Sequence, residues 1–137
     1  MKVEEIYKKY TVKPELVGPD ALISEIIARV AHDRGSRSVF VVDDNQALLG
    51  IIRMEDILNR VGARHVARGF ARASDVLATM AKHLMIEPLW VTPTDDVDDA
   101  LKIAVRFSLE DIPVVRDGKV VGEVDCFEML EGLASKG

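Results

Sequence analysis

One pattern of residues occurs twice in this chain, and it limits what the chain can fold into. In each copy an apolar run ending in Val-Val leads into a polar turn, a second apolar run that contains a glycine, and a helical stretch; the copies span residues 41–58 and 114–130. A unit this small cannot cover its own apolar face, so we expect the two copies to share a core. The seam between two such units leaves clefts that suit a small ligand, and function should be sought there.

Each copy is predicted to fold as a helix, a β-hairpin and a second helix. Apolar residues at positions i, i+3, i+4 and i+7 mark the first helix of each copy, at residues 23–30 and 97–104. β-branched runs at 39–42 and 48–52, and again at 112–115 and 120–124, predict two hairpins with turns at 43–46 and 116–119. Asp20 and Thr94 stand just before the first helices and are predicted to cap them.

The second helix of each copy is predicted directly after its hairpin. Matching apolar residues define one face of these two helices: Ile57, Leu58 and Val61, and then Met129, Leu130 and Leu133. An extended segment precedes each unit, at 16–18 and 89–91, after a helical piece at 3–9 or 73–84. We therefore predict one α/β module with a first repeat at 1–62, including the N-terminal helix, a basic connector at 63–72 and a second repeat at 73–137.

Composition narrows the class of protein. Apolar residues make up 48% of the chain and charged residues 30%, which is typical of a soluble globular protein, and no apolar run approaches the roughly 20 residues that span a bilayer. The start of the chain is too charged for a secretory signal, and the single Cys126 cannot form an internal disulfide, so we expect a cytoplasmic protein. A formal net charge of −5 argues against nucleic-acid binding over the whole surface.

The sequence contains no pattern typical of an active site. His32, His65 and His83 lack the paired spacing of a zinc site, and Cys126 lies on a predicted apolar helix face. No Ser-His-Asp order or phosphate-binding glycine loop stands out. We therefore expect neither enzymatic activity nor a bound metal.

The order of these features resembles a tandem pair of CBS domains (cystathionine-β-synthase-type domains, or a Bateman module). The resemblance covers almost the whole chain and rests on the Gly50-to-Asp56 end of the first hairpin and on two runs, Phe40-Val41-Val42-Asp43 and Ile112-Pro113-Val114-Val115. It implies an α/β (α+β) fold of two pseudo-twofold-related β-α-β-β-α repeats. It also implies adenosyl ligands such as AMP, ADP, ATP or S-adenosylmethionine, frequent association as a homodimer, and a role in sensing rather than catalysis.

The resemblance assigns most ligand contacts to the first copy. Gly50 would let its strand approach a ligand closely, and Asp56 would accept hydrogen bonds from the two ribose hydroxyls. Arg53 stands where the family usually has Ser or Thr facing the phosphate, and Arg37 and Ser38 stand at a further phosphate-binding position. If the two arginines lie about 6 Å apart, their repulsion amounts to about 3 kcal/mol, so we expect an empty pocket to be strained and an anion to relieve it.

The base of the ligand would lie against the second copy. By the resemblance, its neighbours would be Leu89 and the strand entrance at Leu109 and Glu110. Trp90 is predicted to be a core residue, with stacking on an adenine as the alternative. The alternative to ligand binding by the first copy is that Arg53 is a solvated surface charge and Asp56 is an ordinary carboxylate at a helix start.

Four arginines recur at every fourth residue through the connector: Arg60, Arg64, Arg68 and Arg72. On one helix they would form a basic stripe, and like charges at this spacing repel. Arg64 and Arg68 are candidates for contacts to the outer phosphates of ATP. A solvated connector that faces a partner subunit and a contact to nucleic acid are the other interpretations.

The equivalent positions in the second copy carry only acids: Glu110, Asp111, Asp125 and Glu128. Carboxylates disfavour a phosphate unless a divalent cation intervenes, so we expect this cleft to be empty or to need a cation. The function favoured by the sequence is a regulatory module that senses an adenine nucleotide and acts on an unidentified protein. The alternatives are a dimerisation adaptor with vestigial clefts and a nucleic-acid-binding module.

Overall fold

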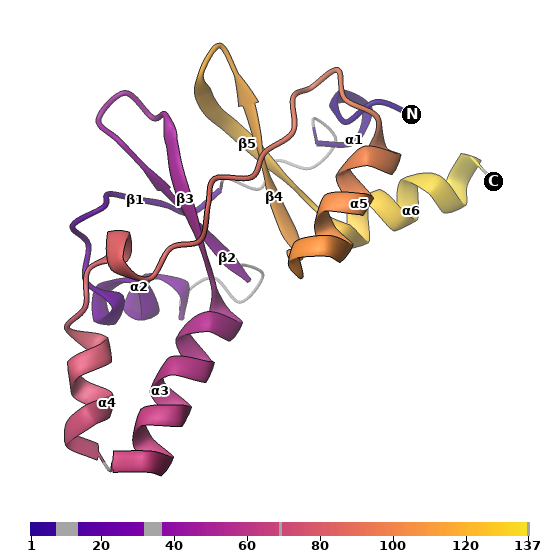
Figure 1. Ribbon diagram of the computed structural model, residues 1–137. Helices are drawn as coiled ribbons and strands as arrows, with labels where there is room; N and C mark the ends of the chain where they lie inside the picture. Colours follow the sequence, from indigo (N-terminus) through magenta and orange to yellow (C-terminus); the bar gives the residue numbers. More distant parts are fainter. Residues whose placement is uncertain (8–13, 32–36, 69, 137) are drawn as a thin grey trace.

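The computed structural model describes residues 1–7, 14–31, 37–68 and 70–136, and leaves the side chains of residues 63–73 and Lys136 undescribed. Two β-hairpins stand side by side at its centre (Figure 1). The first belongs to a three-stranded sheet with the order β1 (Leu16–Val17), β2 (Ser38–Val42) and β3 (Leu48–Arg53). The second pairs β4 (Asp111–Arg116) with β5 (Lys119–Asp125).

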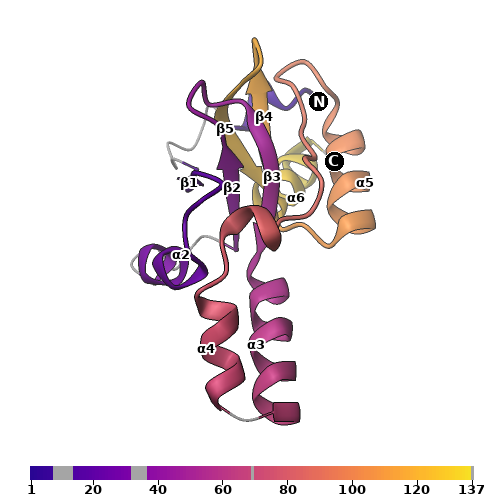
Figure 2. The same ribbon diagram turned by 60° about the vertical axis from the view of Figure 1, so that its left-hand side comes forward.

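Helices flank the hairpins in the predicted order. α2 (Ile23–Val30) and α5 (Val97–Phe107) precede the hairpins, and α3 (Met54–Arg68) and α6 (Cys126–Lys136) follow them. α1 (Glu4–Tyr7), α4 (Phe70–Leu77) and the 3-10 turn η1 (Ala81–His83) complete the set, so the helical piece predicted at 73–84 is divided between α4 and η1. α3 and α4 pack together as a helical hairpin that projects away from the sheets (Figures 1 and 2).

The two copies repeat each other in strand register. Gly50 lies opposite Val41 in the antiparallel pair β2 and β3, and Gly122 lies opposite Val114 in β4 and β5; in both hairpins the register shifts directly after the valine. β1 runs parallel to β2, and Val91 forms the equivalent parallel bridge to β4. The mixed α/β fold of two repeated units is therefore confirmed.

The strand β2 is buried on both faces because its side chains alternate between two cores. Phe40 packs with residues of β4 and β5, including Ile112 and Val124, whereas Val39 and Val41 pack with residues of α2. Val39, Phe40 and Val41 are at most 1% exposed. Successive side chains of a strand point to opposite faces, so a strand between two packed layers needs apolar residues at every position.

The segment ahead of each copy packs against the other copy. The N–H of Val3 donates to the carbonyl of Asp95 (2.9 Å), and Val3 lies in the core with β4, β5 and α6. Conversely, the N–H of Ala81 donates to the carbonyl of Ala21 (2.7 Å), and Ala81 lies in the core of the first copy. The boundaries at 62 and 73 stay a sequence prediction, and in space each leading segment belongs to the opposite half.

The predicted helix caps are wrong. α2 and α5 begin at Ile23 and Val97, after Asp20 and Thr94, and within the described chain the residues that flank their starts make no side-chain cap. The N–H of Ile23 donates instead to the carbonyl of Thr79 (2.9 Å). The carbonyl of Thr79, just before η1, therefore accepts a hydrogen bond from the start of α2 that a polar side chain was predicted to accept.

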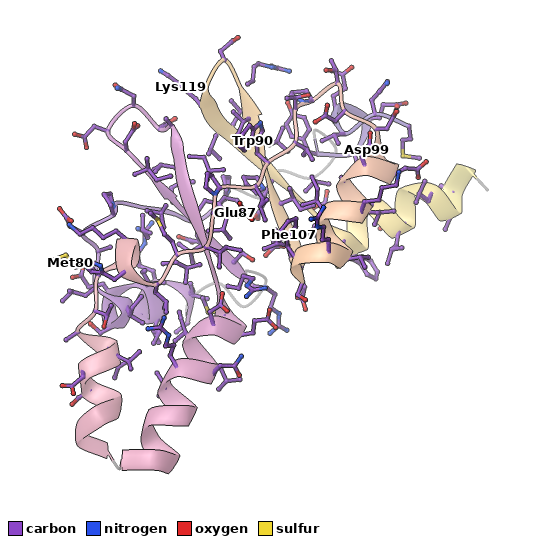
Figure 3. All side chains as sticks on the ribbon, in the orientation of Figure 1. Met80, Glu87, Trp90, Asp99, Phe107 and Lys119 are labelled. Carbon is purple, nitrogen blue, oxygen red and sulfur yellow. The ribbon has the colours of Figure 1, made fainter. Side chains whose placement is uncertain are left out.

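Several apolar residues predicted to be buried are exposed. Ile57 and Met129 are buried as predicted, but their neighbours Leu58 and Leu130 are 71% and 57% exposed, because a helix turns by about 100° per residue. Trp90 is 49% exposed on the connection ahead of α5, so its prediction as a core residue is wrong (Figure 3). No helix within the described ranges is long and apolar enough to cross a membrane.

Candidate functional site

A cavity of about 420 Å³ lies between the two copies at the end of the first hairpin. Its wall from the first copy forms because Ser38 and Arg53 are opposite partners in β2 and β3, and α3 begins directly after Arg53. Residues of both copies line it: Arg37, Ser38, Arg53, Met54, Glu55, Leu58, Ser108 and Glu110. The seam predicted from the repeat thus contains a space large enough for a small ligand.

Four of the predicted ligand residues line this cavity, namely Arg37, Ser38, Arg53 and Glu110. The other four were not among the predicted ligand residues. The sequence does predict that the backbone N–H groups around Met54 and Glu55, at the start of the helix after Arg53, attract an anion. Ser108 ends α5 in the left-handed conformation (φ 52°), and its place in the cavity depends on how the copies pack.

The other four predicted residues, Gly50, Asp56, Leu89 and Leu109, are not among the residues that line the cavity. Asp56 is bonded to the lining residue Arg53. A Cβ atom on Gly50 would lie 2.7 Å from the carbonyl oxygen of Ile86, so this glycine permits the close approach of a protein segment. Leu109 is 2% exposed in the core shared by the copies, and Leu89 packs against that core. Their side chains therefore stabilise the seam from its apolar side.

The arginine stripe is described only in part. α3 continues through Gly62 to Arg68, so the backbones of Arg64 and Arg68 lie on the projecting helical hairpin. Their side chains lie outside the described residues, and Arg60 is exposed. The predicted contacts of Arg64 and Arg68 with outer phosphates remain a prediction.

The guanidinium of Arg53 is surrounded by oxygen acceptors. Its Nε and Nη2 donate to Oδ2 and Oδ1 of Asp56, both at 2.7 Å, and its Nη1 donates to the carbonyl of Phe107 at 2.6 Å. Nη1 also lies 2.9 Å from Oε1 of Glu55. The hydrogen bonds with Asp56 raise the pKa of Arg53, and both side chains are only 20% exposed. Such a two-pronged charged pair is strong and well oriented.

Arg37 also faces a carboxylate. Its Nε lies 3.6 Å from Oε2 of Glu110 in the other copy, and both side chains are well exposed. The expected strain of an empty pocket is therefore not met, because each of the two guanidinium groups, Arg37 and Arg53, already has a carboxylate beside it. The backbone N–H of Arg37 donates to Oδ2 of Asp111 (2.9 Å), which ties the two copies together at the cavity.

Acidic residues of the second copy occupy the positions that correspond to Ser38 and Arg53 of the first copy. Asp111 and Asp125 are opposite partners in β4 and β5, and burial, with added repulsion from Asp125, raises the pKa of Asp111 to about 6. Glu128 is 7% exposed, and burial beside Asp125 raises its pKa to about 8. Its Oε2 has no hydrogen-bond partner among the described atoms. Within the described ranges, no group of three or more His, Cys, Asp or Glu residues is arranged to hold a metal ion.

A sequence profile of the CBS domain matches residues 3–63 and 73–135. The chain belongs to the CBS domain family, as a tandem pair. It is 32% identical to a CBS domain-containing protein from Thermotoga maritima of known crystal structure, with a TM-score of 0.84 over 100% of this chain and 96% of that chain. A CBS-domain protein from Agrobacterium tumefaciens shares the fold at 20% identity and a TM-score of 0.78, over 96% and 92% of the two chains.

Two further proteins are similar to this chain. CBSX2, solved in complex with AMP, is 19% identical with a TM-score of 0.73 over 98% of this CBS pair and 97% of that chain. The meiotically up-regulated gene 70 protein of Schizosaccharomyces pombe is 35% identical over 99 residues, which are 72% of this chain. This CBS pair spans only 12% of the length of that yeast protein.

The cavity of this CBS pair contains several groups that can contact an anion. It contains two guanidinium groups and the hydroxyl of Ser38, and α3 begins at its wall, where the helix dipole is positive. Glu55 and Glu110 add negative charge at the same cavity. The lining therefore offers both cationic and anionic side chains to a ligand.

Proposed function

We propose that this CBS pair is a regulatory, non-catalytic module that binds an adenosyl ligand in the cavity between its copies. AMP, ADP or ATP fits best, and S-adenosylmethionine is the alternative. The observation that carries the proposal is the cavity itself, in which Arg37 and Arg53 of one copy face Ser108 and Glu110 of the other. The AMP bound by CBSX2, a CBS pair of the same fold, supports this class of ligand.

Four residues have roles in this proposal. Arg37, Ser38 and Arg53 hold the phosphate, and Asp56, the bonded partner of Arg53, accepts hydrogen bonds from the ribose hydroxyls. The base lies toward the second copy, near Glu110. Because the contacts come from both copies, a ligand that prefers one arrangement of the copies shifts their packing, and this shift is the regulatory signal to a partner protein.

Calorimetry of the whole chain with AMP, ATP and S-adenosylmethionine tests the proposal. Wild type is expected to bind at least one of them, and Arg37→Ala to weaken nucleotide binding by about tenfold, the value of one charge-assisted contact. Arg60→Ala is the matched control, since it removes the same charge from an exposed position on α3. Absence of binding by wild type, or equal losses in the two variants, would contradict the proposal.

A second function, dimerisation, is favoured by exposed apolar side chains on the helices. These residues are 57% to 81% exposed: Leu58, Val105, Phe127 and Leu130. We propose that two CBS pairs associate through such faces, and a module with vestigial clefts would act as an adaptor in this way. Sedimentation should then show a dimer that Phe127→Ser weakens, together with a melting temperature that no nucleotide changes if the clefts are vestigial.

The nucleic-acid interpretation depends on the arginine stripe of α3 and α4. Gel-shift experiments across salt concentrations test it, because phosphate contacts make affinity fall steeply as salt rises. A cytoplasmic location remains an expectation from the sequence.

A further inference from the structure

The guanidinium and the carboxylate that the proposed function assigns to phosphate and ribose are bonded to each other. Both prongs of the Arg53 guanidinium reach Asp56 at 2.7 Å, and its remaining nitrogen reaches the carbonyl of Phe107 at 2.6 Å. The side chains of Arg53 and Asp56 are each only 20% exposed, so water competes weakly for this pair. For a ligand to bind Arg53 or Asp56, it must therefore replace hydrogen bonds that these two side chains already make.

We propose that the Arg53–Asp56 pair is an internal latch that makes the site select a phosphorylated nucleotide over the corresponding nucleoside; this inference rests on the proposed adenosyl-ligand function. A phosphate supplies anionic oxygens that replace the carboxylate around the guanidinium. Asp56 is then free to accept hydrogen bonds from the ribose hydroxyls. A nucleoside supplies no anion, so its ribose has to compete with a charged, two-pronged donor for the same carboxylate oxygens.

Arg53 and Arg37 differ in exposure and in how firmly they are held, as the latch requires. Arg37 lies 3.6 Å from Glu110 with both side chains more than 60% exposed, so it can turn to a ligand at little cost. Arg53 is mostly buried and is held by Asp56, Glu55 and a backbone carbonyl. Release of Arg53, and not of Arg37, therefore sets the threshold for binding.

Release of Arg53 from Asp56 would also affect a contact with the second copy. Phe107 is the last residue of α5, and a carbonyl at a helix end has no partner within its own helix. Arg53 satisfies this carbonyl from the other copy. When Arg53 turns to a phosphate, the contact weakens and the end of α5 loses a link to the first copy, which couples ligand choice to the packing of the two copies (Figure 3 marks Phe107).

Calorimetry with AMP and adenosine on the whole chain tests the latch. Wild type is expected to bind AMP at least about tenfold more tightly than adenosine, the value of one charge-assisted contact. In Arg53→Met, which keeps an apolar stem of similar length, AMP binding should weaken about tenfold while adenosine binding tightens, because Asp56 is freed. Arg37→Met is the matched control and should weaken AMP binding without improving adenosine binding.

Arg53→Lys gives a second measurement that keeps the charge but not the two-pronged geometry. It should retain most AMP binding and still improve adenosine binding, and it decides the question if Arg53→Met fails to fold. Equal weakening of both ligands in the Arg53 variants, or equal affinity of wild type for the two ligands, would overturn the latch. If ATP or S-adenosylmethionine binds but neither AMP nor adenosine binds to wild type or to any variant, the latch fails and the proposed function stands. If none of the four ligands binds, the proposed function fails as well.

Discussion

Replacing Glu128 with glutamine should stabilise this protein near neutral pH. The side chain is 7% exposed, and one of its carboxyl oxygens has no hydrogen-bond partner among the described atoms. Burial, together with the nearby charge of Asp125, raises the pKa of Glu128 from 4.5 to about 8. At pH 7 the folded protein therefore holds a proton at this site that the unfolded chain releases.

The sign and size of the effect follow from this difference in bound protons. Because the folded state binds more protons than the unfolded chain, the free energy of unfolding falls as pH rises from 4.5 toward about 8. One pKa unit corresponds to about 1.4 kcal/mol, so Glu128 costs at most about 3 kcal/mol at pH 7. Glutamine has the same shape and does not ionise, so Glu128→Gln should recover about 1–3 kcal/mol at pH 7 and nothing at pH 4.5.

Urea unfolding at several pH values between 4.5 and 8 measures this effect. The wild-type free energy of unfolding should decrease across the range. The curve of Glu128→Gln should start at the wild-type value at pH 4.5, be flatter, and lie above it at higher pH. Glu25→Gln, at an exposed carboxylate of α2, serves as the control and should keep the wild-type pH dependence. A Glu128→Gln curve parallel to that of wild type, or a variant less stable at pH 8, would refute the reasoning.

Two further predictions concern the seam between the copies. Gly50→Ala should destabilise the fold by about 1–3 kcal/mol, because the added Cβ would meet the backbone of Ile86; its counterpart Gly122→Ala, which would meet only a side chain, should cost less in thermal unfolding. Asp111→Asn should flatten the loss of stability between pH 4 and 6, since burial raises the pKa of Asp111 to about 6; an unchanged slope in urea unfolding would contradict this.

The sequence alone was sufficient for the repeat and its elements. β-branched runs and helical periodicity predicted β2 to β5 and the two helices of each copy that flank its hairpin, because these patterns depend on local geometry that each segment carries with it. The alignment of the copies also placed the acids of one opposite the arginines of the other, and strand register confirms the correspondence of Ser38 and Arg53 with Asp111 and Asp125.

The tertiary structure decided which side chains meet. No local pattern indicates that the segment at Val3 packs on the second copy, or that Leu58 lines the cavity between the copies. The same holds for Arg53. Its residue type predicted a contact with a phosphate, and the fold gives it Asp56 and the carbonyl of Phe107 at the end of α5 as partners. Periodicity specifies which face of an element is apolar, whereas contacts between elements distant in sequence depend on how those faces pack, and that information exists only in the folded chain.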